Sequence, residues 1–245
     1  MSARPPSTFD LLQQAPLCAG LSADELATLA EQAHTRTVES GGFFFHQGEP
    51  ATALYLLRTG HVQLSQLTPE GHQVVVRFIA PGDFFGGIAA LGDAVYPASA
   101  EAIGDCEALA WPGATLAALL ARSPQLALNF LHHLAGRVQE LQDRLRELAT
   151  ERVEQRVARA LLRLVNQTGR RVADGVLIDF PLSRQTLAEM TGTTLYSVSR
   201  ILTRWDEAGI VESGRTRVLV RAPHRLVAIA EDLPPLSGQP SSTDA

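Results

Sequence analysis

Cysteine is scarce in this sequence, with Cys18 and Cys106 as the two cysteines among 245 residues, and lysine is absent altogether. Two isolated cysteines form neither a CxxC metal site nor a disulfide framework, so both are expected to be buried thiols. No apolar run approaches the roughly 20 residues that span a bilayer, and residues 1–10 lack the apolar stretch of a signal peptide. These absences argue against a membrane or secreted protein, and we expect a cytoplasmic one.

The net charge of −5 is distributed unevenly along the chain. Residues 1–150 hold 8 arginines against 15 acidic residues, and residues 226–245 add three acids and no arginine. Residues 151–225, by contrast, hold 13 arginines against 8 acids, a net charge of +5. Because phosphate neutralisation requires a local excess of positive charge, this basic segment is the expected nucleic-acid interface.

Within the basic segment, residues 183–207 read as two short helices joined by a tight turn. Ser183 is the expected N-cap of the first helix and Thr194 that of the second. Gly192 breaks the chain between them, because glycine accepts a left-handed backbone. The second helix places Val198, Ile201, Leu202 and Trp205 on one apolar face and Tyr196, Ser197, Ser199, Arg200 and Arg204 on the others.

Two short strand-like runs, 209–213 and 217–220, follow around a Gly214-Arg215 turn. They form the β-hairpin known as a wing. An ordinary helical hairpin would show the same two helices, but the wing favours a winged helix-turn-helix, whose second helix suits a DNA major groove.

Residues 37–112 consist of short strand-like runs separated by glycines. Spacings of about ten residues with turn signals are typical of an all-β barrel or jelly roll. Short helices precede it within residues 8–39, one of them with a Ser22/Glu25 capping box. The expected strands are Phe43–Phe45, Ala53–Leu57, His61–Leu67, Gln73–Ile79, Ala98–Ala102 and Ala108–Trp111.

Residues 124–151 predict one long helix, in which apolar residues alternate at spacings of three and four. This is the pattern of a coiled-coil seam, so two chains are expected to pair through it. A helix docked on its own domain is the alternative. The seam consists of Leu131, Leu134, Val138, Leu141, Leu145 and Leu148. A separate amphipathic helix over 152–166, a polar connection over 166–174 and a strand over 176–180 should follow.

Three motifs of the β region, His46-Gln47-Gly48-Glu49, Gly60-His61-Val62 and Pro81–Gly86, resemble the CRP/FNR superfamily of transcriptional regulators, and so does the winged helix-turn-helix that follows. The resemblance runs from about Leu17 to Val220. It implies an α+β fold with an N-terminal β-roll of the cyclic-nucleotide-binding type, or jelly roll. The implied divisions are a sensor domain over 1–120, a dimerisation helix over 121–151, a winged helix-turn-helix domain over 152–230 and a disordered tail over 231–245.

The same resemblance implies a homodimeric activator or repressor that binds palindromic double-stranded DNA with TTGA-like half-sites and has RNA polymerase as a partner. Arg200 matches the arginine that reads a guanine, and Tyr196 replaces a glutamate that accepts from cytosine. Ser183, Arg184, Gln185 and Arg215 are the expected phosphate contacts. The remaining expected DNA contacts are Thr194, Leu195, Ser197 and Ser199.

Family members that bind cyclic AMP use a glutamate for the ribose and an Arg-Ser pair for the phosphate. Here Gly87 replaces the glutamate, Pro97-Ala98 replaces the pair, and Leu141-Gln142 replaces the Thr-Ser pair that meets the adenine. We therefore expect cyclic AMP not to bind. The expected effector pocket contains Phe84, Phe85, Gly86, Gly87, Pro97, Ala98, Ser99, Leu141 and Gln142.

The sequence also bears on two other cofactors of the family, the iron–sulfur cluster and haem. Two cysteines cannot supply the four thiolates of an iron–sulfur cluster, which excludes the cofactor of the oxygen-sensing branch. The run Tyr196–Arg200 resembles the nitrogen-oxide-responsive branch, whose members have been linked to haem. The candidate axial ligands are His34, His46, His72, His132 and His133, and no other metal site is expected.

Three alternatives to an effector-controlled regulator stay open to different degrees. An enzyme is disfavoured, because the sequence holds no nucleophile elbow, P-loop or cluster of metal ligands. A regulatory module that acts through protein partners is disfavoured by the +5 charge of residues 151–225. A CRP-like DNA-binding protein that needs no effector is the third.

Overall fold

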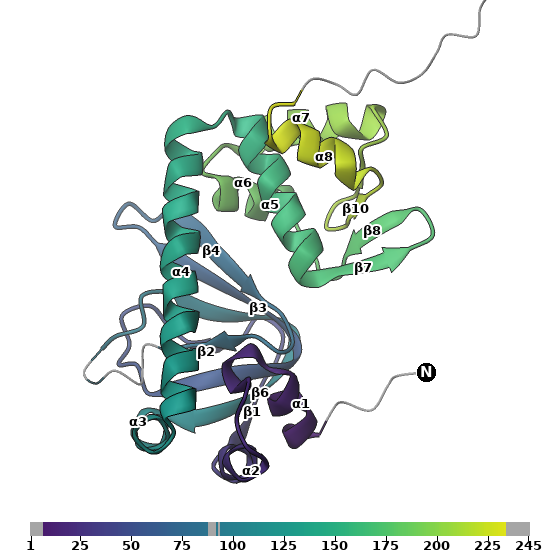
Figure 1. The fold of residues 1–245 in the computed structure, drawn as a ribbon. Helices are drawn as coiled ribbons and strands as arrows, with labels where there is room; N and C mark the ends of the chain where they lie inside the picture. Colours follow the sequence, from purple (N-terminus) through teal and green to yellow (C-terminus); the bar gives the residue numbers. More distant parts are fainter. Residues whose placement is uncertain (1–6, 88–91, 93, 234–245) are drawn as a thin grey trace, which may run out of the picture. The chain divides into compact units, whose positions relative to one another are not determined.

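The computed structural model describes residues 7–87, 92 and 94–233, and Figure 1 shows their secondary structure. The chain divides into two compact units, with the boundary between Arg146 and Glu147. This boundary falls inside helix α4 (Pro124–Thr150), close to its C-terminal end. The long helix, predicted as a segment of its own, therefore contributes to both units. Of the tail predicted over 231–245, residues 234–245 lie outside the described residues.

The first unit is built on the predicted antiparallel β-roll. Its sheet has the order β1-β6-β3-β4, with β2 paired to β6 and β5 paired to β3. The strands are β1 (His34–Val38), β2 (Phe43–Phe45), β3 (Ala53–Leu67), β4 (Gln73–Ile79), β5 (Phe84–Phe85) and β6 (Ser99–Pro112).

Strands β3 and β6 each replace two predicted strands. The pairing of β3 with β6 shifts its register between Leu57 and His61. Gly60 lies in this bulge with φ +83°, and a Cβ there would meet the Asp105 carbonyl oxygen at 2.6 Å. The glycine therefore marks a bulge within one strand, and the prediction of a chain break at this point was wrong. The predicted break between Ala102 and Ala108 was wrong in the same way.

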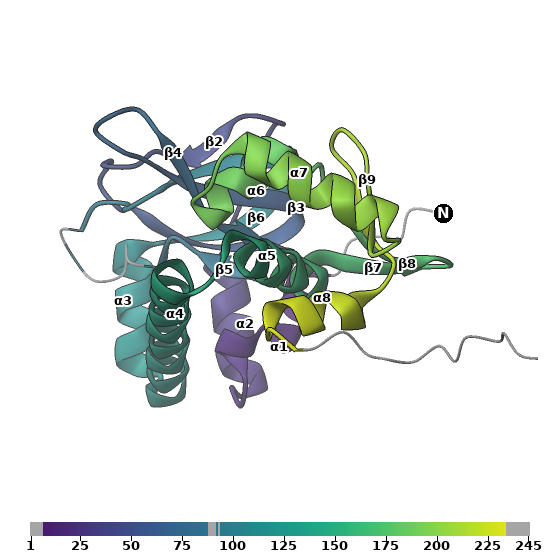
Figure 2. The same ribbon diagram turned by 90° about the horizontal axis from the view of Figure 1, so that it is seen from above.

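Helices cover the apolar outside of the roll. They are α1 (Thr8–Gln14), the 3₁₀ turn η1 (Pro16–Cys18), α2 (Ala23–Glu31), α3 (Gly113–Arg122) and the first turns of α4. The predicted capping box starts α2: the Ser22 amide donates to Glu25 Oε2 at 2.8 Å and Ser22 Oγ accepts from the Glu25 amide at 3.3 Å. Figures 1 and 2 show α3 beside the N-terminal end of α4.

Two apolar clusters form the core of the first unit. The inner one is rich in aromatic rings, among which Phe45 and Tyr96 stack with centroids 3.7 Å apart. The outer one joins the helices to the sheet, and there Trp111 Nε1 donates to the Leu29 carbonyl oxygen at 2.9 Å. Cys18 and Cys106 are free and buried, as predicted.

Helix α4 carries a row of exposed apolar side chains. In the single chain, five of the six predicted seam residues are more than half exposed, namely Leu131, Val138, Leu141, Leu145 and Leu148. Leu134 differs, because it is partly buried against the outer core cluster. No helix of the described residues is long and apolar enough to cross a membrane.

The second unit is a small sheet, of order β7-β8-β10-β9, together with four helices. Its elements are α5 (Val153–Thr168), β7 (Gly169–Val172), β8 (Gly175–Ile178), α6 (Arg184–Thr191), α7 (Leu195–Glu207), β9 (Val211–Ser213), β10 (Val218–Val220) and α8 (Pro223–Ala230). The polar connection predicted over 166–174 was wrong, because α5 continues to Thr168 and β7 pairs with β8 from Gly169.

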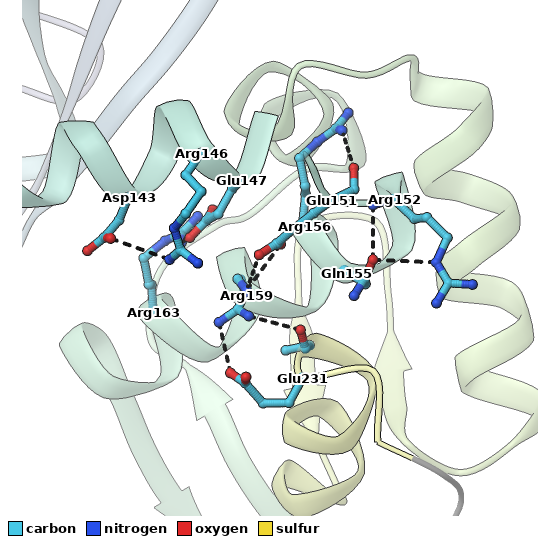
Figure 3. Close-up of polar contacts among 11 residues, drawn as sticks. Asp143, Arg146, Glu147, Glu151, Arg152, Gln155, Arg156, Arg159, Arg163 and Glu231 are labelled. Atoms are coloured by element: carbon cyan, nitrogen blue, oxygen red, sulfur yellow. Dashed lines mark hydrogen bonds and ion pairs between the residues drawn. The ribbon is translucent and has the colours of Figure 1, made fainter. Parts of the chain in front are cut away.

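Ion pairs hold the last turn of α4 within the second unit, as Figure 3 shows. Glu147, which is 7% exposed, accepts from Arg163 Nη1 at 2.7 and 2.9 Å. Glu151 accepts from Arg159 Nε at 2.9 Å, and the same arginine reaches Glu231 after α8 at 2.9 Å. Charge-assisted contacts of this kind hold the end of α4, α5 and α8 together at this point.

Candidate nucleic-acid interface and effector cavity

Helices α6 and α7 begin and end as the sequence predicted. Ser183 Oγ accepts from the Thr186 amide at 3.0 Å and caps α6, which ends at Gly192 with φ +59°. Thr194 Oγ1 accepts from the Ser197 amide at 3.2 Å and caps α7. The turn between the helices is therefore fixed by a left-handed glycine and a side-chain cap.

Helix α7 has one buried and one exposed face. Val198, Ile201, Leu202 and Trp205 are buried, as predicted. Tyr196, by contrast, is 74% exposed, and Arg200 is exposed with no ion-pair partner among the described residues. Arg204 is held by Glu154 at 2.5 Å. The residues that line a shallow depression on the exposed face are Tyr196, Ser199, Arg200, Thr203, Arg204 and Glu207.

Polar contacts hold the wing against the two helices. Asp206 Oδ2, near the end of α7, accepts from both the amide and the hydroxyl of Ser213 at 3.2 Å. An Arg184 guanidinium N–H donates to Ser213 Oγ at 3.2 Å. The wing turn is closed by the Gly214 amide, which donates to the Arg217 carbonyl oxygen at 2.8 Å. The position of the wing relative to α7 is therefore fixed by these side-chain hydrogen bonds.

The predicted DNA contacts fall into two groups. Gln185, Leu195, Tyr196, Arg200 and Arg215 have exposed side chains, whereas Ser199 is half-buried on the same face of α7. Ser183, Arg184, Thr194 and Ser197 use their side chains for caps or for the wing. Arg217 is exposed beside the wing turn and was not predicted, although its spacing from Arg215 was a visible signal.

In the first unit, a cavity of about 220 Å³ lies between α4 and the sheet. Its apolar wall includes Leu54, Ile79, Phe84, Phe85 and Phe130. Its polar wall consists of Arg77 from β4 with His133, Arg137, Glu140 and Arg144 from α4. A Cβ on Gly87 would lie 3.3 Å from Leu54 Cδ1 and 3.4 Å from Phe130 Cζ, so apolar side chains pack closely at this glycine.

Charges influence one another strongly along the polar wall. Burial and the neighbouring Arg137 lower the pKa of Arg77, and this outweighs the opposite effect of Asp83 and Glu140. Burial, followed by Arg137 and Arg77, lowers the pKa of His133. The imidazole is therefore neutral at physiological pH, and the arginines supply the positive charge of the cavity.

The lining agrees only partly with the predicted effector pocket. Phe84, Phe85, Gly86, Gly87 and Leu141 line the cavity. The other four predicted residues, Pro97, Ala98, Ser99 and Gln142, are not among its described lining. The Pro97 carbonyl accepts from Gln66 Nε2, and Ser99 Oγ accepts from the Gln47 amide. Ala98 is buried and Gln142 is exposed. The sequence reading missed the arginines, although Arg137 precedes Leu141 by four residues and shares its helix face.

Two family models match the chain, a cyclic nucleotide-binding domain over residues 35–123 and a Crp-like helix-turn-helix domain over residues 155–229. The cyclic AMP receptor protein of Thermus thermophilus is 33% identical over 219 residues, which cover 89% of this chain and 98% of the relative. The chain belongs to the CRP/FNR family of transcriptional regulators.

Solved structures of CRP/FNR proteins agree with this placement. FixK2 from Bradyrhizobium japonicum has a TM-score of 0.71 at 27% identity, over 80% of this chain and 96% of that one. The Thermus thermophilus catabolite activator protein has a TM-score of 0.52 at 34% identity, over 90% and 100%. The predicted fold and the DNA-binding regulatory role of the CRP/FNR family are thus confirmed, while no branch that responds to nitrogen oxides is singled out.

The haem that some CRP/FNR regulators bind finds little support in these residues. His34, His46, His72 and His132 are exposed, and only His133 among the five candidates lines the cavity, beside two arginines. A volume of about 220 Å³ is below the roughly 300–1,000 Å³ of sites for drug-sized ligands, and a porphyrin is larger than such ligands. The cavity does not fit a haem. No cluster of three or more metal-ligating side chains occurs in the described part of the chain.

Proposed function

We propose that the protein is a homodimeric, sequence-specific regulator in which α7 of each protomer enters a DNA major groove. The observation that carries this proposal is the exposed face of α7, where Arg200 has no ion-pair partner in the described chain. A guanidinium in that position can donate two parallel hydrogen bonds to a guanine. We further propose palindromic sites with TTGA-like half-sites, with RNA polymerase as the partner of the bound dimer.

The dimer is supported by the exposed row on α4. Leucine and valine side chains stabilise by about 1.5–3 kcal/mol each when fully buried, and five of them are more than half exposed in the single chain. Pairing of two α4 helices would bury them. A two-fold dimer also supplies two α7 helices, as a palindromic site requires.

We also propose that the cavity of the first unit is the effector site, and that cyclic AMP is not the effector. The name of the Thermus thermophilus relative favours cyclic AMP. Against it, Gly87 offers no carboxylate to a ribose, and Pro97 and Ala98 offer no charge to a phosphate. Titration calorimetry with cyclic AMP tests this directly, and a micromolar dissociation constant would contradict it.

Selection from a random duplex library tests the DNA-binding proposal. The full-length protein should enrich a palindrome whose half-sites are centred about 10 base pairs apart. Filter binding at two salt concentrations should then show about 10³-fold or higher preference for the selected duplex over random duplex. Equal affinity for both duplexes would leave only non-specific binding and would contradict the proposal.

A further inference from the structure

Two arginines of the cavity in the first unit have unused hydrogen-bond donors. The Nε atoms of Arg77 and Arg137 are buried, and neither finds an acceptor among the described residues. Arg77 makes one long contact to Asp83, at 3.4 Å, and Arg137 pairs with Glu140 at 2.6 Å. Protein atoms cover these Nε atoms, so the donors available to a ligand are on the Nη atoms. Each guanidinium has five N–H donors, and the contacts to Asp83 and Glu140 use one Nη atom of each arginine. The remaining Nη donors at the cavity wall can bind an anion.

The electrostatics of the cavity favour the same kind of ligand. The Arg77 side chain is only 12% exposed, and Arg137 is close enough to lower its pKa. Two like charges with little access to water repel each other more strongly than they would at the surface. The carboxylates of Asp83 and Glu140 offset this repulsion only in part, so an anion between the arginines would relieve it.

The opposite wall restricts the rest of the ligand. Phe84, Phe85 and Phe130 present aromatic surface to the same space. The volume of about 220 Å³ admits a molecule smaller than a typical drug. A ligand that satisfies both walls therefore combines one anionic group with a compact apolar body.

We propose that the cavity binds a small organic anion whose carboxylate or phosphate group accepts hydrogen bonds from Arg77 and Arg137. Its apolar body packs against the phenylalanines of the opposite wall. The charge that cyclic-AMP-binding relatives place in the Arg-Ser pair is here supplied by β4 and α4. The effector role of this anion rests on the proposed function, but its binding does not require DNA.

Binding is tested with matched probes on the full-length protein by thermal shift and titration calorimetry. Phenylacetate and phenyl phosphate carry the two anionic groups on one aromatic body, and benzyl alcohol carries none. Inorganic phosphate tests the anion alone, and cyclic AMP is included as a larger anion. At least one aromatic anion should bind and raise the melting temperature, and benzyl alcohol should bind about tenfold more weakly or not at all. Binding of neither aromatic anion, whatever phosphate and cyclic AMP do, or equal binding of benzyl alcohol, would overturn the inference.

The variants Arg77→Gln and Arg137→Gln locate the binding. Each should weaken the affinity for the anion about ten- to hundredfold, as expected when a charged hydrogen bond is lost. Arg146→Gln is the matched control, because it lies on the same helix outside the cavity lining, and it should change nothing. If Arg77→Gln fails to fold, the more exposed Arg137 decides the test. Unchanged affinity in Arg137→Gln would overturn the inference.

The same titrations separate this inference from the proposed function. Anion binding that is lost in both arginine variants supports the inference even if the wild-type protein shows no preference for any duplex. That combination would contradict the DNA-binding proposal alone. Preference for a selected duplex without binding of any anion would support the DNA-binding proposal and contradict the anion inference.

Discussion

At the scale of single residues, Arg200 is the side chain that we propose to read a base directly. Arg200→Ala should weaken binding to the selected duplex by about 1–3 kcal/mol and affect random duplex much less. Filter binding on both duplexes measures this. Arg204→Ala is the control, because Glu154 already holds Arg204 at 2.5 Å, and its loss on the selected duplex should be smaller. Equal losses on the two duplexes for Arg200→Ala would make that arginine a phosphate contact only.

For Arg215, which lies exposed at the turn of the wing, we propose a contact to a backbone phosphate. A phosphate contact is independent of sequence, so Arg215→Ala should weaken selected and random duplex alike. The slope of log affinity against log salt should become shallower by about 1. Titration over several salt concentrations checks this. Arg122→Ala, in the first unit, should leave the slope unchanged, and an unchanged slope for Arg215→Ala would exclude the phosphate contact.

Gly192 ends α6 with φ +59°. An alanine in this left-handed conformation costs about 1–2 kcal/mol, and its Cβ would also lie 3.1 Å from Leu148 Cδ2. Gly209 is the matched control, because it has φ +66° and a Cβ added there would meet no described atom within 4 Å. Gly192→Ala should therefore lower the free energy of unfolding more than Gly209→Ala does, as measured by urea denaturation. Equal losses would mean that the Leu148 contact adds nothing.

At the scale of elements, the exposed apolar row of α4 predicts a dimer. Leu145 is 69% exposed in the single chain. Leu145→Arg should give monomers with reduced DNA affinity, because it would place two charges inside an apolar seam. Light scattering after gel filtration measures the mass. Leu128→Arg, on the same helix outside the seam, should remain dimeric. A wild-type mass equal to one chain at micromolar concentration would contradict the dimer itself.

The ion pairs at the end of α4 differ in burial, and their contributions should differ accordingly. Glu147→Gln removes a charge from a 7% exposed residue that Arg163 contacts twice, and should lower the free energy of unfolding by about 1–3 kcal/mol. Asp143→Asn breaks the exposed pair with Arg146, at 3.4 Å, and should cost about 0–1 kcal/mol. Urea denaturation compares the two. A larger effect for Asp143→Asn would contradict this ranking.

At the scale of the whole molecule, the sequence predicted those helices and strands whose pattern lies within a few neighbouring residues. Strand β4 and the caps of α6 and α7 were placed correctly, since periodicity, caps and glycine positions are properties of neighbouring residues. Strand β1 was missed because Val38 is its one buried residue, which leaves no alternating pattern. Strand β7 was missed for a related reason, since GRRV contains no buried side chain.

The two functional regions differ in the same respect. The exposed face of α7, for which we propose DNA reading, could be predicted as exposed, because one helix carries it and its polar side chains follow from helical spacing alone. The arginine pair of the cavity could not. Spacing from Leu141 places Arg137 on the right face of α4, but Arg77 comes from β4, and the two arginines meet only in the folded chain. The burial that makes them unusual is a property of the tertiary structure, which no local pattern reports.

Helix α4 combines a row of apolar residues that ends at Leu148 with the ion-paired Glu147, and the ion-paired Glu151 follows directly after the helix. Each residue turns an α-helix by about 100°. A single insertion or deletion between Val138 and Glu147 would therefore turn Glu147 by about 100° around the helix axis relative to Leu131 and Val138. Seven residues nearly restore the original angle. Among homologous chains that keep both features, the length of this helix should vary in whole heptads rather than in single residues.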